Sequence, residues 1–204
     1  MAINYTVQAD VIDIQRDSPQ NTDVFLIDSN VWYWMTYPNA SQSAIPYQLS
    51  DYPDYVNRAL MAGARLYWSG LSLAELSHLI ERTERQIYVQ INGSITTKEY
   101  RHNLASDHAR IVKEIQASWG QVKSLAAPLP MSIDEATTDA AFSRLQTQLV
   151  DGYDLFILET MTKQGVIQII TDDGDFATIP GIQVFTSNRH VLNSARIQGK
   201  ELKR

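Results

Sequence analysis

Two apolar stretches, Asp23-Val-Phe-Leu-Ile-Asp28 and Val166-Ile-Gln-Ile-Ile-Thr171, decide the fold of this 204-residue chain. Each is a short run of apolar, largely β-branched or aromatic residues, which is typical of a strand buried on both faces of a parallel sheet. Turn-forming residues follow directly, Ser29-Asn30 after the first run and Asp172-Asp173-Gly174-Asp175 after the second. The sequence therefore predicts an acidic side chain at the carboxyl end of each strand.

The rest of the chain alternates between strand and helix patterns. Further strands are expected at Arg65–Ser69 and Ile182–Phe185, and helices are expected after Pro53, Ser72, Thr96, Ser132, Asp151-Gly152 and Ser187. Strands interleaved with helices indicate an α/β fold, with a parallel sheet of about four to five strands flanked by helices. In such a Rossmann-like domain, ligands bind beyond the carboxyl ends of the strands.

Composition and charge exclude several classes of protein. The chain has no cysteine, which excludes disulfide scaffolds, thiol nucleophiles and thiolate zinc sites. No export signal and no membrane helix are evident, so we expect a soluble, cytoplasmic protein that does not contact membranes. The net charge of −6 is distributed in blocks, with residues 81–123 and 187–204 basic and the rest acidic. Such blocks suit an acidic centre that faces a basic surface, or simply solvated helix faces.

Four carboxylates are expected at the same edge of the sheet: Asp28, Glu75, Asp154 and Asp173. Carboxylates that are packed together repel one another unless a cation neutralises them. Because oxygen ligands favour hard ions, the cofactor expected here is Mg²⁺ or Mn²⁺. One or two such ions can activate water and stabilise the leaving oxygen in phosphodiester hydrolysis.

Each acid also has a purely structural interpretation. Glu75 can close a capping box with Ser72, and Asp151 and Asp154 suit a helix N-terminus. The segment Asp172-Asp173-Gly174-Asp175, with three acids and a glycine, can form an ordinary turn. Asp28 is harder to explain structurally, because an acid directly after four apolar strand residues is costly to bury.

The order of these motifs resembles that of PIN-domain nucleases. The resemblance is carried by Leu-Ile-Asp28-Ser29-Asn30, Leu73-Ala-Glu75-Leu76, Asp154-Leu-Phe-Ile-Leu and Ile170-Thr171-Asp172-Asp173-Gly174-Asp175-Phe176. It extends from Asp23 to about Phe185. Glu159 departs from the family, in which many members have a small residue at that point of the helix.

The resemblance implies a single PIN-like domain over 1–204, with enlarged regions at 36–69 and 87–132 and a basic C-terminal helix or tail at 187–204. It implies metal ligation by Asp28, Glu75, Asp154 and Asp173 and metal-dependent RNA cleavage. The supporting residues would be Ser29, Asn30, Asp151, Thr171 and Asp175. For many bacterial members it further implies a toxin blocked by a small antitoxin, and it is compatible with a homodimer.

Two weaker features bear on RNA binding. Nine of the nineteen aromatic residues lie between Trp32 and Trp68; Trp34, Tyr37 and Tyr47 among them could stack on unpaired bases, although core packing is the commoner role. Several basic residues could contact phosphate or simply be solvated: Arg82, Arg85, Arg101, Arg110 and Lys113.

Two other functions are open. The first is a phosphatase of the haloacid-dehalogenase type with Asp28 as its nucleophile, although that chemistry needs a second acid two residues on and position 30 is Asn. The second is a nucleic-acid-binding PIN module that has lost catalysis. P-loop and Rossmann dehydrogenase functions are excluded because the glycine fingerprint of neither is present.

Overall fold

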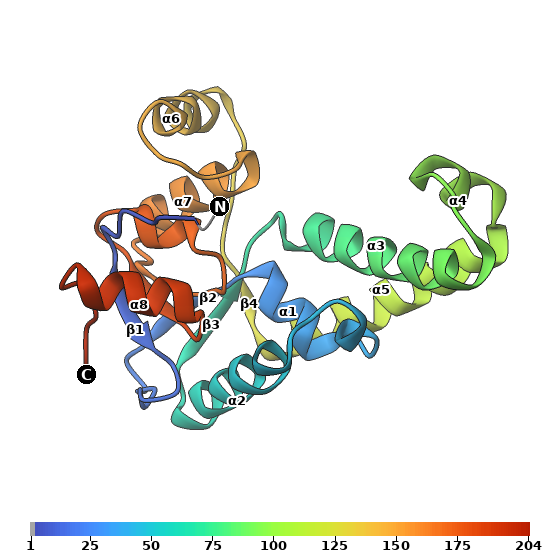
Figure 1. Cartoon of the computed structure of the whole chain (residues 1–204). Helices are drawn as coiled ribbons and strands as arrows, with labels where there is room; N and C mark the ends of the chain where they lie inside the picture. The colour runs from blue at the N-terminus through green and yellow to red at the C-terminus, as the bar shows by residue number, and fades with distance from the viewer. Residues whose placement is uncertain (1–2) are drawn as a thin grey trace.

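The computed structural model describes residues 3–204 and has one six-stranded sheet with helices on both faces (Figure 1). The strands are β1 (Asp10–Asp13), β2 (Val24–Ile27), β3 (Arg65–Trp68), β4 (Ala127–Pro128), β5 (Gln168–Ile170) and β6 (Gln183–Thr186). Their spatial order is β1-β6-β5-β2-β3-β4, and every pairing is parallel. The predicted α/β class and the parallel, helix-flanked sheet are confirmed.

The sheet has two more strands than the four that the sequence patterns locate. β1 is four residues long, and β4 has only two residues, one of them Pro128. Proline cannot donate to the next strand and is tolerated at a sheet edge, so a segment that resembles a connector forms the outer strand.

The helices that precede α6 are α1 (Ser29–Thr36), α2 (Pro46–Ala62), α3 (Ser72–Asn92), α4 (Thr97–Asn103) and α5 (Ala105–Leu125). α2 begins at Pro46, seven residues before the expected start, because Pro46 occupies the first helical turn and the Gln48 side chain accepts from the Ile45 amide. The single helix expected from Thr96 to Gly120 is broken at Leu104, where the backbone leaves the helical region.

The second group of helices is α6 (Glu135–Leu145), α7 (Gly152–Gln164) and α8 (Arg189–Ile197). Glu159 of α7 pairs with Arg144 of α6 at 3.0 Å, and both side chains are largely buried. The family departure at position 159 therefore attaches α6 to α7. No helix within residues 3–204 is long and apolar enough to cross a membrane.

The side chains of successive strand residues pack alternately in two hydrophobic cores, one on each face of the sheet. Leu26, Ile169 and Val184 pack with α7 and α8, whereas their neighbours Ile170 and Phe185 pack on the other face with α1, α2, α3 and α5. This alternation follows from the two-residue period of a strand, and covering both faces requires apolar residues at nearly every strand position.

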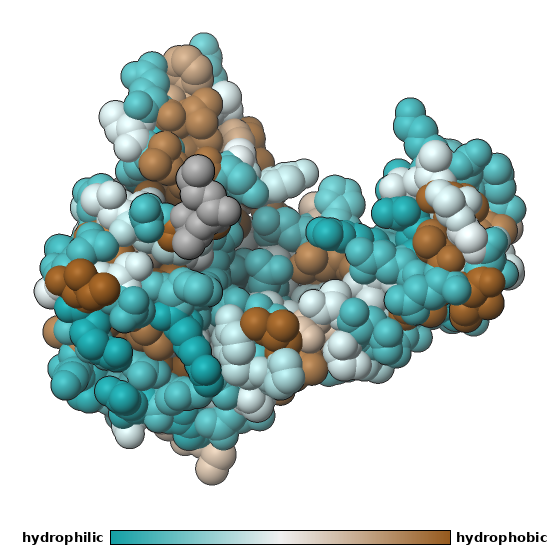
Figure 2. Space-filling view, in the orientation of Figure 1, coloured by the Kyte–Doolittle hydropathy of each residue, from teal (hydrophilic) through white to brown (hydrophobic). Residues whose placement is uncertain are grey.

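Two parts of the molecule project from this body. α3 and α5 run alongside each other to a tip formed by α4, and α6 stands on the other side (Figure 1). Figure 2 shows a hollow between these projections, with hydrophobic surface on the α6 side. The exposed apolar side chains of α6 and of the segment after it include Phe142, Leu145 and Leu149.

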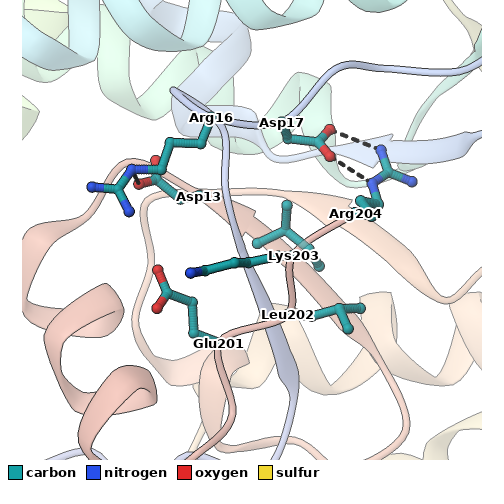
Figure 3. Close-up of a pocket in the computed structure, with 8 residues that line it drawn as sticks. Asp13, Arg16, Asp17, Glu201, Leu202, Lys203 and Arg204 are labelled. Atoms are coloured by element: carbon teal, nitrogen blue, oxygen red, sulfur yellow. Dashed lines mark hydrogen bonds and ion pairs between the residues drawn. The ribbon is translucent and has the colours of Figure 1, made fainter.

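The C-terminal segment is attached to the sheet instead of forming a loose basic tail. The Val11 amide donates to the Lys200 carbonyl at 2.9 Å, and the Leu202 amide donates to the Val11 carbonyl at 2.8 Å. Arg204 then forms an ion pair with the buried carboxylate of Asp17 at 2.8 Å (Figure 3). It forms a second with the buried carboxylate of Asp23 at 2.6 Å, and its guanidinium lies 4.5 Å from the centre of the Phe185 ring.

We predict that Arg204→Ala lowers the free energy of unfolding by about 2–4 kcal/mol, because it leaves two buried carboxylates without their partner. Burial acts to raise the pKa of Asp23, but the hydrogen bonds from Arg204 and Gln20 outweigh it and lower the pKa. A carboxyl group whose pKa is lowered on folding stabilises the native state at pH values above its ordinary pKa of 3.8. This stabilisation is lost as the pH falls below that value. Urea unfolding should therefore show that the difference between wild type and variant shrinks in acid. Lys203→Ala is the control, and an equal loss in both variants would contradict the prediction.

Candidate active site at the carboxyl edge of the sheet

The two central strands bring their acids together through the backbone. The Asp28 amide, just beyond β2, donates to the carbonyl of Ile170 in β5 at 3.1 Å. The Thr171 hydroxyl then donates to Asp28 Oδ2 at 2.6 Å and accepts from the Asp173 amide at 2.9 Å. Thr171 therefore contacts the Asp28 carboxylate and the Asp173 backbone at once, and its role as a supporting residue stays a prediction.

Glu75 enters the site from the first turn of α3. Its carboxylate accepts from the Ser29 hydroxyl at 2.6 Å, and Ser29 is the first residue of α1. The capping-box interpretation of Glu75 is wrong, because the Ser72 hydroxyl accepts from the Ser69 amide and α3 has no side-chain cap. Glu75 is thus directed toward the residues that follow β2.

Asp154 enters from the first turn of α7 and is 7% exposed. Asp151 caps that helix by accepting from the amides of Tyr153 at 2.9 Å and Asp154 at 3.1 Å. The cap interpretation is therefore correct for Asp151, which is exposed, and does not apply to Asp154, whose side chain makes no capping bond.

The pKa values indicate that these carboxylates lie close enough to affect one another. Burial is the largest cause of each shift; it raises the pKa of Asp28 to about 6, of Glu75 to about 7 and of Asp154 to about 9. The negative charges of Asp28, Asp151, Asp173 and Glu75 all raise the pKa of Asp154 further. Burial also raises the pKa of Asp173. In the metal-free protein the cluster therefore retains protons near neutral pH that a bound cation would displace.

Opposing hydrogen bonds limit the shifts at two of the acids. Those from Thr171 and Asn30 lower the pKa of Asp28, and the one from Ser29 lowers the pKa of Glu75. The Ser29 hydroxyl engages Oε2 of Glu75, so Oε1 of this carboxylate could still ligate an ion. Among residues 3–204, no three Asp, Glu or His side chains are already arranged to hold a metal ion.

The other members of the acidic turn face different neighbours. Asp172 accepts from Tyr47 at 2.9 Å, Gln48 at 2.6 Å and Tyr52 at 2.6 Å, so it attaches α2 to the end of β5. The Asp175 amide donates to Asp173 at 2.9 Å, while burial and the charge of Asp173 raise the pKa of the Asp175 carboxyl. Asp175 is thus beside Asp173, and its role as an auxiliary acid stays a prediction.

Tyr5 is a neighbour of the site that sequence reasoning missed. A Cβ on Gly174 would lie 2.2 Å from its ring, so the ring covers the turn between Asp173 and Asp175. Burial and then the charges of Asp175 and Asp173 raise the pKa of the Tyr5 hydroxyl. Nothing in the local sequence indicates this contact, because it joins segments about 170 residues apart.

The basic residues singled out for phosphate binding mostly have partners within the chain. Arg101 pairs with Glu81, Arg110 pairs with Glu84 and Asp107, and Arg85 donates to the Ile95 carbonyl at 3.2 Å. These contacts hold α3, α4 and α5 together. Arg82 and Lys113 form no ion pair within the described part of the chain.

We predict that Asp154→Asn stabilises the metal-free protein at neutral and alkaline pH, by about 1–3 kcal/mol. With the folded pKa near 9 and an ordinary value of 3.8, the native state binds more protons than the unfolded state between these values. The stability of the wild type should therefore fall as the pH rises through this window. Thermal melts in a chelator should show a shallower decline for Asp154→Asn, whereas the exposed control Asp139→Asn should follow the wild type.

We also predict that Gly174→Ala destabilises the protein by about 1–3 kcal/mol through overpacking against Tyr5. In a protein that already carries Tyr5→Ala, the substitution Gly174→Ala should cost less stability than it does in the wild type. Additive effects in a denaturant-based double-mutant cycle would show that the two residues do not contact each other.

Comparisons with protein-family models, with curated proteins and with solved structures find no match to this chain. The roles of the four acids are therefore argued from their placement in this fold. The resemblance to PIN-domain nucleases remains a prediction from the order of the motifs.

Proposed function

We propose that the protein is a divalent-metal-dependent endoribonuclease that hydrolyses phosphodiester bonds in RNA. The observation that carries this proposal is the set of four carboxylates, from four separate elements, whose pKa values are all raised at one edge of the sheet. Like charges that are removed even partly from solvent are costly to a fold, so their collection at the usual ligand position of an α/β sheet favours a functional role.

The chemistry of the donors fits Mg²⁺ or Mn²⁺. All four side chains are carboxylates, which are hard oxygen ligands, and Thr171 and Ser29 orient two of them. When bound, such an ion supplies Lewis-acid activation of water and neutralises charge on the phosphate. The acids Asp28, Glu75, Asp154 and Asp173 would hold it.

Hydrolysis forms one bond from a water oxygen to phosphorus and breaks one bond from phosphorus to a ribose oxygen. The chain's task is to present the phosphate to the acids and to keep the oxygens aligned. The hollow beside the site is open to solvent between α6 and the α3–α5 projection (Figure 2), which suits an extended single strand. The choice of RNA, an antitoxin partner and a homodimer are suggested by the resemblance alone.

A phosphatase that uses Asp28 as a nucleophile is less well supported. The residue that would serve as its acid is Asn30, and the Asn30 side chain hydrogen-bonds with Asp28. An amide cannot protonate a leaving group, so that mechanism lacks its proton donor at this position.

The test is cleavage of a labelled, partly single-stranded RNA in Mn²⁺ or Mg²⁺. We expect cleavage by the wild type, none in a chelator, and a loss of at least about a hundredfold in Asp28→Asn. Asp139→Asn, on the exposed face of α6, is the matched control and should cleave normally. Cleavage that survives Asp28→Asn would refute the proposal, and a phosphate covalently attached to Asp28 would favour the phosphatase.

Metal binding can be measured separately from cleavage. A ligand that binds only the native state raises the melting temperature. Mn²⁺ should therefore raise the melting temperature of the wild type and of Asp139→Asn but not that of Asp28→Asn. An equal rise in all three would place the ion elsewhere.

A further inference from the structure

A cavity of about 250 Å³ lies beside the acidic site, between α1, α3 and the start of α2. Its lining includes Asn30, Tyr33, Trp34, Gln48, Arg82 and Gln86. We propose that this cavity binds the nucleotide next to the cleaved phosphate of a single-stranded RNA, with its base against Trp34 and its phosphate at Arg82. The inference rests on the proposed function and names the part of the protein that would select the substrate.

The cavity and the acids share two residues. Asn30 lines the cavity, and it follows Asp28 by two residues, at the start of α1, where its side chain acts to lower the pKa of Asp28. Gln48 also lines it and donates to Asp172 at 2.6 Å, next to Asp173 in the chain. A strand whose phosphate lies at the acids would thus place an adjacent nucleotide at the cavity.

The walls of the cavity are held in place by contacts between lining residues and with the core. The Tyr33 hydroxyl shares hydrogen bonds with Thr83 at 2.7 Å and Ser43 at 2.9 Å. The Trp34 ring lies 5.1 Å from the Tyr52 ring, and Tyr52 is fully buried. Because these side chains are already ordered, a ligand would lose little free energy in fixing them.

The chemistry of the lining favours an anion with an aromatic portion. No lining residue carries a carboxylate, although the neighbouring site is strongly acidic. Arg82 is exposed and forms no ion pair within residues 3–204, so its guanidinium is available to a phosphate. Trp34 offers a surface for stacking, and the amide of Gln86 offers polar contacts to a base edge.

The size of the cavity limits the ligand. Pockets that enclose drug-sized ligands measure about 300–1,000 Å³, so this one suits a single base with its attached phosphate. The other arginines on the projection are engaged within the chain, Arg101 with Glu81, Arg110 with Glu84 and Arg85 with the Ile95 carbonyl. Arg82 is the basic residue that lines the cavity, so we expect it to affect RNA binding there.

The experiment measures binding of a fluorescein-labelled, ten-nucleotide single-stranded RNA of mixed sequence to the full chain in a chelator, so that no cleavage occurs. Arg82→Gln should weaken binding by about fivefold or more and reduce the salt dependence by about one phosphate contact. Arg65→Gln is the control, since Arg65 is exposed at the amino end of β3, at the opposite edge of the sheet.

The stacking contact needs its own variants. Trp34→Leu should weaken binding by about fivefold or more, and Trp34→Phe should retain most of it, because a phenyl ring can still stack on a base. Because Trp34 also packs on Tyr52, each Trp34 variant is used only if its melting temperature matches that of the wild type. The variant Gln86→Ala, at an exposed residue, provides a test that does not depend on packing.

The outcomes separate this inference from the proposed function. Binding that depends on Arg82 and Trp34, without metal-dependent cleavage, would support the cavity and refute the nuclease. Cleavage that depends on Asp28, with equal RNA binding in Arg82→Gln, Trp34→Leu and Arg65→Gln, would refute the cavity and leave the nuclease standing. Absence of RNA binding by the wild type would refute the cavity assignment.

Discussion

The hydrogen bond from Thr171 to Asp28 is the interaction on which the candidate site depends. It joins the ends of the two central strands, which pair in parallel through Phe25–Ile27 and Gln168–Ile170. Without this donor the Asp28 carboxylate would be buried beside Asp173 with fewer compensating bonds. The same threonine fixes the Asp173 amide, so one side chain sets the relative positions of two acids.

Around this contact, two helices supply further acids, and these acids lie at the helix ends and not in the hydrophobic cores. α3 brings Glu75 and α7 brings Asp154, each from its first turn, while the bodies of these helices bury apolar side chains on opposite faces of the sheet. Carboxylates at a helix N-terminus gain from the helix dipole, which offsets part of their repulsion. The architecture thus gathers negative charge where backbone amides are most able to tolerate it.

Much of this arrangement could be predicted from the sequence, because the strands that carry Asp28 and Asp173 are buried on both faces and their patterns are strong. The edge strands could not, since β4 consists of Ala127 and Pro128 and depends on pairing with Trp68 and Tyr67. Contacts between distant segments were equally hidden: Tyr5 over Gly174, and Arg204 between Asp17 and Asp23. The partner of Glu75 was also missed, because Ser72 offered a local alternative that the helix does not use.

The C-terminal segment has a consequence for how the sheet meets other molecules. β1 is an edge strand, and the backbone groups of Val11 that would face solvent are bonded to Lys200 and Leu202. An exposed edge is a template for pairing with another chain, so this segment protects the protein against strand-to-strand aggregation. At the opposite edge, the two-residue β4 with its proline offers little to pair with. Both outer strands of the sheet, β1 and β4, are therefore closed to pairing with further strands. New partners must approach through the helices or the hollow between them.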